Sequence, residues 1–200
     1  MLKPTILSLS LLTIVSTTAV SPALADIAEY FVSADRFLVQ MVVVLHAFAI
    51  VPTLAVATWL AERYSRKRVV VSGLTVFVIA GIAGGIVNNI YVLLVLRALL
   101  GVGLGMVIPF STALIADFFE GEERQRLMGM SSSLNMAGGM FALVISGYLA
   151  VISWRLPFLI YLCGIPVLVL ILLYLPDIHD KHKLEENDKR AFPAHVYKVA

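Results

Sequence analysis

The stretch Thr58-Trp-Leu-Ala-Glu-Arg-Tyr-Ser-Arg-Lys-Arg68 joins two long apolar runs through a short polar turn that carries four basic residues. Cationic side chains resist transfer across a bilayer, so a short basic turn between apolar runs stays on the cytoplasmic side of a membrane. The stretch therefore predicts that the chain crosses a membrane on both sides of this turn, and it predicts the direction of both crossings.

The composition of the whole chain leads to the same class of protein. Of 200 residues, 60% are hydrophobic and 14% are charged, with a mean hydropathy of +0.94. A soluble domain of this size has no interior that hides so much apolar surface, so the bilayer acts as the solvent. One cysteine, Cys163, lies inside an apolar run, which excludes an intrachain disulfide and a cysteine metal cluster.

Six apolar runs approach the roughly 20 residues that a helix needs to cross a bilayer. They cover residues 5–25, 38–61, 69–88, 91–116, 127–152 and 156–175. The runs are continuous and lack the alternation of membrane β-barrels, which favours helices. The sequence therefore predicts an all-α membrane protein with a six-span bundle over residues 1–176 and a cytoplasmic tail over 177–200.

The basic residues indicate the orientation of this bundle. With a cytoplasmic N-terminus, the cytoplasmic side receives Lys3, the basic turn, Arg124, Arg126 and the lysines of the tail. The outer loops then hold only Arg36 and Arg155. This asymmetry obeys the positive-inside rule and predicts that both termini lie in the cytoplasm, with the chain in the cytoplasmic membrane.

The first run has a second interpretation. Lys3, the apolar core and Ala23-Leu24-Ala25 also resemble a cleavable signal peptide, whose removal would leave five spans. We favour a retained first span, because the apolar region is longer than a typical signal core and Pro22 lies near the cleavage position.

The fourth run contains Arg97 within an Arg-x-x-x-Gly-x-Gly-x-Gly frame. At 1.5 Å per residue from Tyr91, the arginine lies about 9 Å inside the outer boundary, where an ionised group needs a wet cavity or a polar partner. It lines a substrate or proton path, or it extends back to the outer headgroups. The glycine face favours the first interpretation. His46, deep in the second run, is either a protonatable site or a packed neutral histidine.

Glycines on one helix face allow a neighbouring helix to approach closely. The sequence predicts this packing role for Gly81, Gly85, Gly101, Gly103, Gly105, Gly138 and Gly139.

Three motifs resemble the major facilitator superfamily of transporters, especially its drug and sugar efflux members. They are the Thr-x-x-x-Glu-Arg-x-Ser-Arg-Lys turn, the frame around Arg97, and Ser153-Trp-Arg-Leu-Pro-Phe158. The resemblance covers nearly the whole chain but only the N-terminal six-span half of the family's fold. The family's usual pattern has glycine, aspartate and glycine where this chain has Thr58, Glu62 and Ser65. Ala142-Leu143 replaces the glycine-proline pair of antiporters, which weakens that assignment.

The resemblance implies a secondary active transporter rather than an enzyme. Its fold is two inverted three-helix repeats, and it moves small molecules by alternating access, with efflux driven by protons or another ion. The expected partners are lipid, the small-molecule substrate and a second six-span half or a second copy, with no cofactor and no nucleic acid. The alternative is a non-transporting membrane protein, either a truncated product or a regulatory subunit. No Gly-Lys-Ser loop supports ATP-driven transport.

The resemblance also implies a gating charge cluster at the inner helix ends. Its members are Glu62, Arg63, Arg66, Lys67 and Asp117. Glu62 and Arg66 are four residues apart and pair if the helix continues that far. The alternative is a set of ordinary solvated charges. In the tail, His179 and His182 are interpreted as solvated residues, so no metal site is expected.

Overall fold

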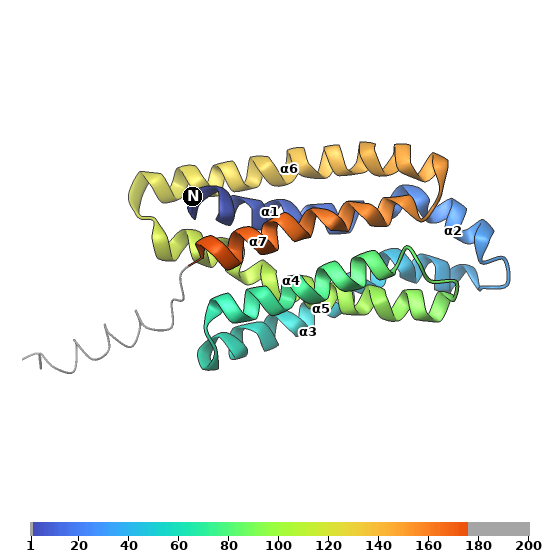
Figure 1. The fold of residues 1–200 in the computed structure, drawn as a ribbon, viewed down its shortest axis with the longest axis horizontal. Coiled ribbons are helices and arrows are strands. Elements are labelled where there is room, and N and C mark those ends of the chain that lie inside the picture. Colours follow the sequence, from blue (N-terminus) through green and yellow to red (C-terminus); the bar gives the residue numbers. More distant parts are fainter. Residues whose placement is uncertain (1, 176–200) are drawn as a thin grey trace, which may run out of the picture.

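The structure is a computed structural model that describes residues 2–175, and within this range it is a bundle of helices without strands (Figure 1). The helices run along the long axis of the bundle. In chain order they are α1 (Leu2–Thr18), the 3-10 turn η1 (Ser21–Ala23), α2 (Leu24–Tyr30), α3 (Arg36–Arg63), α4 (Arg66–Ala83), α5 (Ile90–Phe118), α6 (Gly121–Ile152), the 3-10 helix η2 (Leu156–Cys163) and α7 (Gly164–Tyr174).

Five helical segments within residues 2–175 are long and apolar enough to cross a membrane. They cover Lys3–Tyr30, Arg36–Arg63, Ile90–Phe118, Gly121–Ile152 and Leu156–Tyr174. The remaining helix, α4, has 18 residues and begins with Arg66-Lys67-Arg68. Its apolar part therefore starts only at Val69. Together these helices confirm the predicted all-α membrane fold.

The first span extends beyond the predicted end at residue 25. The chain turns through η1 and continues as α2 to Tyr30, although Asp26 and Glu29 make this segment polar in sequence. Ile27 of α2 is fully buried and joins the hydrophobic core. The helix continues because Ile27 still packs on protein, while Glu29 is exposed and Asp26 is half-buried.

Polar side chains fix the starts of two spans. The Asp35 carboxylate accepts a hydrogen bond from the backbone N–H of Phe37, 3.2 Å away, at the start of α3. The Asn89 side chain accepts from the N–H of Tyr91, at 2.8 Å, at the start of α5. Such caps satisfy backbone donors that the first helical turn leaves open. At the other end of α5, Gly121 has a φ of 57°, which permits the tight turn into α6.

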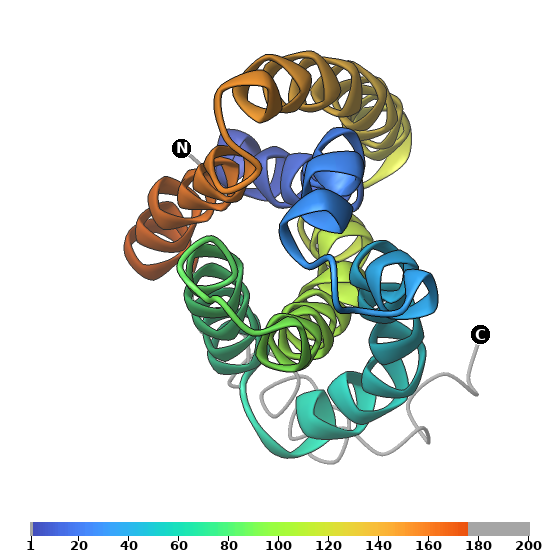
Figure 2. The same ribbon diagram turned by 90° about the vertical axis from the view of Figure 1, so that its right-hand side faces the viewer.

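The packing of the helices follows the two-repeat architecture. α5 lies at the centre of the end-on view and contacts α1, α3, α4 and α6 (Figure 2). α1 packs on α6, and α5 packs on α3. α1 and α6 are the first and fifth spans, and α5 and α3 are the fourth and second. Replacing each span of one repeat by the corresponding span of the other repeat therefore converts the first pair into the second. The fold is therefore the predicted half-bundle of two inverted three-helix repeats.

The three glycines of α5 face two different neighbouring helices. A Cβ atom added at Gly101 would lie 2.2 Å from the carbonyl oxygen of His46, and one at Gly105 would lie 2.6 Å from Cβ of Thr53, both on α3. A Cβ at Gly103 would instead lie 2.7 Å from backbone atoms of α4. Absent side chains thus let α5 approach α3 and α4 at the same level.

The other predicted packing glycines face α1 and η2. Gly138 and Gly139 of α6 contact Leu11 and Ile14 of α1. On the far side of the bundle, a Cβ at Gly81 would lie 2.6 Å from the Tyr161 ring, and one at Gly85 would lie 3.0 Å from Cβ of Phe158. These two aromatic residues of η2 are central to the site described below.

We expect Gly101→Ala to destabilise the bundle and Gly147→Ala to leave it intact. Both glycines are helical, so both substitutions bring the same gain in helix propensity. Only Gly101 faces a backbone atom that cannot move aside, whereas no atom lies within 4 Å of a Cβ at Gly147. Overpacking of this kind costs about 1–3 kcal/mol, measurable by thermal unfolding in detergent. Equal unfolding temperatures for the two variants would contradict the close approach.

Candidate functional site

Arg97 of α5 is buried at the centre of the bundle, with 2% of its surface exposed. Its Nη1 donates a hydrogen bond to the Tyr161 hydroxyl, 2.8 Å away. The guanidinium also lies over two rings, 4.8 Å from the centroid of Phe158 and 5.8 Å from that of Tyr161. Aromatic faces attract a cation most strongly where water is excluded, so these rings stabilise the charge at this depth.

The Tyr161 hydroxyl links three spans. It accepts from Arg97 of α5 and donates to the backbone carbonyl of Ser16 in α1, 3.3 Å away. Tyr161 itself belongs to η2, and its ring packs edge-on against Phe77 of α4, with centroids 5.5 Å apart. Tyr161 therefore ties the arginine to the first, third and sixth spans.

Some hydrogen-bond donors of Arg97 have no acceptor within residues 2–175. Its Nε and Nη2 atoms are buried and have no hydrogen-bond partner within residues 2–175. A buried donor without a partner is costly, and native proteins rarely keep one without a reason. Two nitrogens of the guanidinium, which carry three N–H bonds, thus remain open to an acceptor.

His46 of α3 packs against α5 one helical turn from this arginine. It is buried, and neither of its ring nitrogens has a partner within the described range. Its backbone carbonyl packs against Gly101, one turn after Arg97 on α5, and the arginine charge acts on the imidazole electrostatically. The two residues predicted for the transport pathway are therefore buried on adjoining turns of α3 and α5.

The basic turn between α3 and α4 contacts three different helix ends. Arg66 forms an ion pair with Asp117 near the end of α5. Lys67 donates to the carbonyl of Leu172 in the last turn of α7, at 2.9 Å. Arg63 stacks 4.1 Å from the centroid of the Trp59 ring within α3. Four of the five predicted cluster residues thus take part in contacts at this end of the bundle.

The fifth residue, Glu62, does not pair with Arg66. That pair required α3 to continue through both residues, but α3 ends at Arg63 and α4 begins at Arg66. Within residues 2–175 the ion-pair partner of Arg66 is Asp117 alone. Glu62 instead lines a cavity of about 230 Å³ together with Arg66 and Pro109.

A second polar cluster closes the opposite end of the bundle, and the sequence did not predict it. Arg155 Nη2 donates to the Tyr30 hydroxyl at 3.1 Å and to the side-chain oxygen of Asn88. The Arg155 guanidinium also lies 5.1 Å from the Trp154 ring, and Trp154 contacts Phe158 edge-on. A chain of aromatic contacts thus connects this surface arginine with buried Arg97. The polar break at Asn88-Asn89 was the feature of the sequence that indicated polar side chains at this end. It did not indicate that Arg155 would be the partner of Asn88.

His179 and His182 lie outside the described residues, as does the rest of the predicted tail.

Comparison with known families identifies this arrangement. The sequence matches the model of the major facilitator superfamily over residues 6–199. The chain belongs to this superfamily. The family resemblance noted from three motifs is thereby confirmed across the bundle.

Two curated superfamily members are similar in sequence. A quinolone resistance protein, NorA of Staphylococcus aureus, is 29% identical over 124 residues, which cover 62% of this chain and 31% of NorA. A multidrug transporter, MdtP of Bacillus subtilis, is 29% identical over 121 residues, covering 60% of this chain and 22% of MdtP. The aligned parts thus span less than a third of either relative.

Solved transporters share the fold. A bacterial homologue of the human lysosomal transporter Spinster, in an inward-facing and occupied conformation, superposes with a TM-score of 0.70 and 18% identity. The superposition covers 88% of this chain and 44% of that one. A peptide transporter of the POT type gives the same TM-score and identity over 93% of this chain and 43% of its own. The superfamily bundle described here corresponds to somewhat less than half of each.

We expect Tyr161→Phe to destabilise the bundle by about 1–3 kcal/mol, because it leaves a third buried nitrogen of Arg97 without a partner while keeping the ring. Tyr148→Phe removes the same hydroxyl from a side chain that is 75% exposed and serves as the control. Thermal unfolding of both variants in detergent measures the difference. A Tyr161→Phe variant as stable as the control would show that the hydroxyl does not support Arg97.

Proposed function

We propose that this chain forms the N-terminal half-bundle of a secondary active transporter, which moves small molecules across the membrane by alternating access. One observation carries the proposal: in a superfamily bundle, the buried Arg97 holds two guanidinium nitrogens without an acceptor within residues 2–175, one helical turn from the contact with His46. A charge placed so deep in the bilayer is expensive and is characteristic of a substrate or ion path.

Arg97 and His46 are the pathway residues in this proposal. The burial of Arg97 among aromatic rings supports the pathway interpretation over an arginine that extends to the outer headgroups, because the guanidinium is surrounded by protein. Its open N–H groups suit an acceptor that binds in one state of the cycle and leaves in another. Neutral imidazole offers one donor and one acceptor, so His46 is suited to relay a proton.

The substrate class follows from the relatives. NorA and MdtP are described as a quinolone resistance protein and a multidrug transporter. We infer that this chain serves the efflux of similar small molecules, coupled to protons or another ion. Superfamily transporters bind substrate between two six-span halves, so the partner is a second half or a second copy.

The inner cluster is proposed to favour one state of the cycle. The Arg66–Asp117 ion pair joins α4 to α5, and Lys67 joins α4 to α7. The two side chains of the ion pair are 27% and 32% exposed, so the pair contributes only about 0–1 kcal/mol to stability. An interaction of that size is weak enough to break and re-form within a transport cycle.

Transport is tested with everted membrane vesicles from cells that produce the chain, in which efflux becomes uptake. We expect ethidium, a hydrophobic cation, to accumulate when a proton gradient is imposed. Arg97→Gln reduces the rate by roughly tenfold or more, the factor for one charged hydrogen bond. Arg124→Gln, which removes an exposed charge from α6, leaves the rate unchanged. Vesicles without gradient-driven uptake would show that copies of this chain alone do not form a working transporter.

The same vesicles test the inner cluster. Asp117→Arg, which places two cations together, lowers uptake, and the exchanged pair Arg66→Asp with Asp117→Arg restores it, since the ion pair re-forms in reverse. Loss without restoration would show that Asp117 acts through some other contact.

Both termini are proposed to lie in the cytoplasm of a cell whose cytoplasmic membrane holds the bundle. The basic turn, the start of α1 and the end of α7 lie at one end of the bundle, and the end of α2, which Arg155 contacts through Tyr30, lies at the other (Figure 1).

Orientation is measured in a Cys163→Ser background with a membrane-impermeant maleimide on intact cells. Val32→Cys, in the exposed α2–α3 loop, reacts directly, whereas Arg68→Cys reacts only after the cells are permeabilised. The reverse pattern would invert the proposed topology.

A further inference from the structure

Two hydrogen bonds join the same two segments of the chain, the start of α5 and the start of η2. The buried one runs from Arg97 to the Tyr161 hydroxyl. The other lies at the surface, where Arg155 Nη2 donates to the side-chain oxygen of Asn88, and we refer to it as the surface bridge. Asn88 lies in the turn before α5, and Arg155 directly precedes η2.

The two hydrogen bonds lie at matching distances along their segments. The rise from Ile90, where α5 begins, to Arg97 is about 10 Å at 1.5 Å per residue. The rise from Leu156, where η2 begins, to Tyr161 is also about 10 Å, at 2.0 Å per residue. One hydrogen bond alone leaves two segments free to tilt about it. Two bonds about 10 Å apart along both segments fix their tilt and their register.

The surface bridge is itself supported by its neighbours. The Tyr30 hydroxyl donates to the side-chain oxygen of Asn88 and accepts from Arg155, both at 3.1 Å, which closes a triangle of three side chains. A Cβ atom added at Gly85, in the turn that leads to Asn88, would lie 3.1 Å from the carbonyl oxygen of Arg155. Backbone thus touches backbone beside the bridge, so a shift of Arg155 displaces the turn from which α5 begins.

We propose that Asn88 and Arg155 are positioning residues for Arg97: while the surface bridge is closed, it holds the guanidinium against Tyr161. The inference rests on the proposed role of Arg97 in transport. The Arg97–Tyr161 hydrogen bond is 2.8 Å long, and sliding α5 by one residue's rise of about 1.5 Å stretches it beyond hydrogen-bonding range. A bridge between partly exposed side chains contributes little to stability, so its main effect is on the register of α5 and η2.

The position of Arg97 is measured by fluorine NMR on the full chain in detergent, with meta-fluorotyrosine at all seven tyrosines. The fluorine shift responds to the hydrogen bonds of the neighbouring hydroxyl. Tyr161→Phe deletes one signal and so assigns it, and Arg97→Gln shows where that signal moves without the guanidinium. We expect Asn88→Ala and Arg155→Met, which each break the surface bridge, to move the Tyr161 signal toward its Arg97→Gln position.

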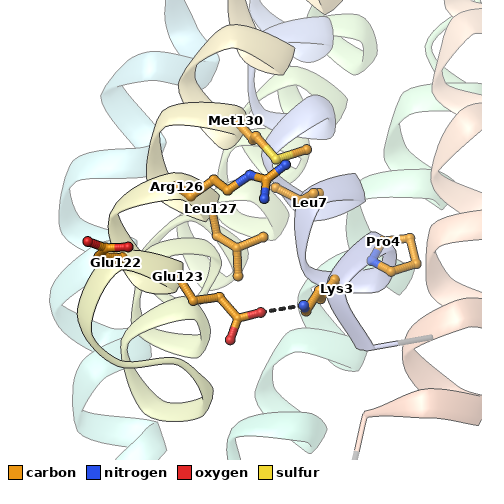
Figure 3. Close-up of a pocket in the computed structure, with 8 residues that line it drawn as sticks. All are labelled: Lys3, Pro4, Leu7, Glu122, Glu123, Arg126, Leu127 and Met130. Carbon is orange, nitrogen blue, oxygen red and sulfur yellow. Dashed lines mark hydrogen bonds and ion pairs between the residues drawn. The ribbon is translucent and has the colours of Figure 1, made fainter.

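Conservative variants and a distant contact are the controls. Arg155→Lys keeps a cationic donor and Asn88→Asp keeps an acceptor, so both leave the Tyr161 signal near its original position. The matched control is Glu123→Gln, which removes the ion pair between Glu123 and Lys3 (Figure 3). That pair also joins two spans at the surface, α1 and α6, but neither residue belongs to α5 or η2.

Uptake of ethidium by the everted vesicles measures the consequence for transport. Asn88→Ala lowers the rate per molecule by roughly threefold or more, because displacing a functional group by a fraction of an ångström has an effect of this size. Asn88→Asp preserves the rate. In an Arg97→Gln background, Asn88→Ala causes no further loss, since there is no guanidinium to position.

An unchanged Tyr161 signal in both Asn88→Ala and Arg155→Met would overturn the inference. A further loss of uptake in the Arg97→Gln background would overturn it as well, because the surface bridge would then affect transport without the arginine. If the original chain shows no uptake, the transport function of this chain alone fails. The fluorine signal then still decides whether the bridge positions Arg97.

Discussion

The burial of one arginine inside a membrane bundle restricts which side chains can surround it. Arg97 requires partners that water would otherwise supply, and it obtains them from the Tyr161 hydroxyl and two aromatic faces. Those rings need room, which Gly81 of α4 and Gly85 in the turn after α4 provide by having no side chains. One buried charge thus explains an aromatic pair on the sixth span and a glycine pair on the third.

The centre and the ends of the bundle are held by different forces. Lipid is as apolar as leucine, so helices associate through close packing and hydrogen bonds rather than through the hydrophobic effect. Glycine contacts join α5 to α3 and α4 at the centre, and the solvent does not weaken them. At the surface, Arg66–Asp117 and the Arg155 cluster are partly exposed and are screened by water. The half-bundle is therefore expected to move as a rigid body whose terminal contacts exchange.

Local patterns predicted the all-α bundle of long apolar helices, because run length, basic turns and helix rise depend only on neighbouring residues. The end of the first span was missed, since Asp26 and Glu29 conceal the burial of Ile27. Glu62 was paired with Arg66 on the assumption of a continuous helix, which the extended Tyr64 and Ser65 interrupt. The contacts of Tyr161 and Arg155 join residues far apart in sequence, and nothing in a single chain states which distant side chains meet.

The 3-10 winding of η2 also affects how far the last span reaches. Three residues per turn place Phe158 and Tyr161 one above the other, on the side facing Arg97. The rise of about 2.0 Å per residue lengthens these eight residues to about 16 Å, against about 12 Å in an α-helix. With α7 following at the α-helical rise, the 19-residue span extends to about 32 Å, close to the thickness of the hydrocarbon core. A sequence slightly short for the bilayer is thus matched to it by the same stretched turns that surround the arginine.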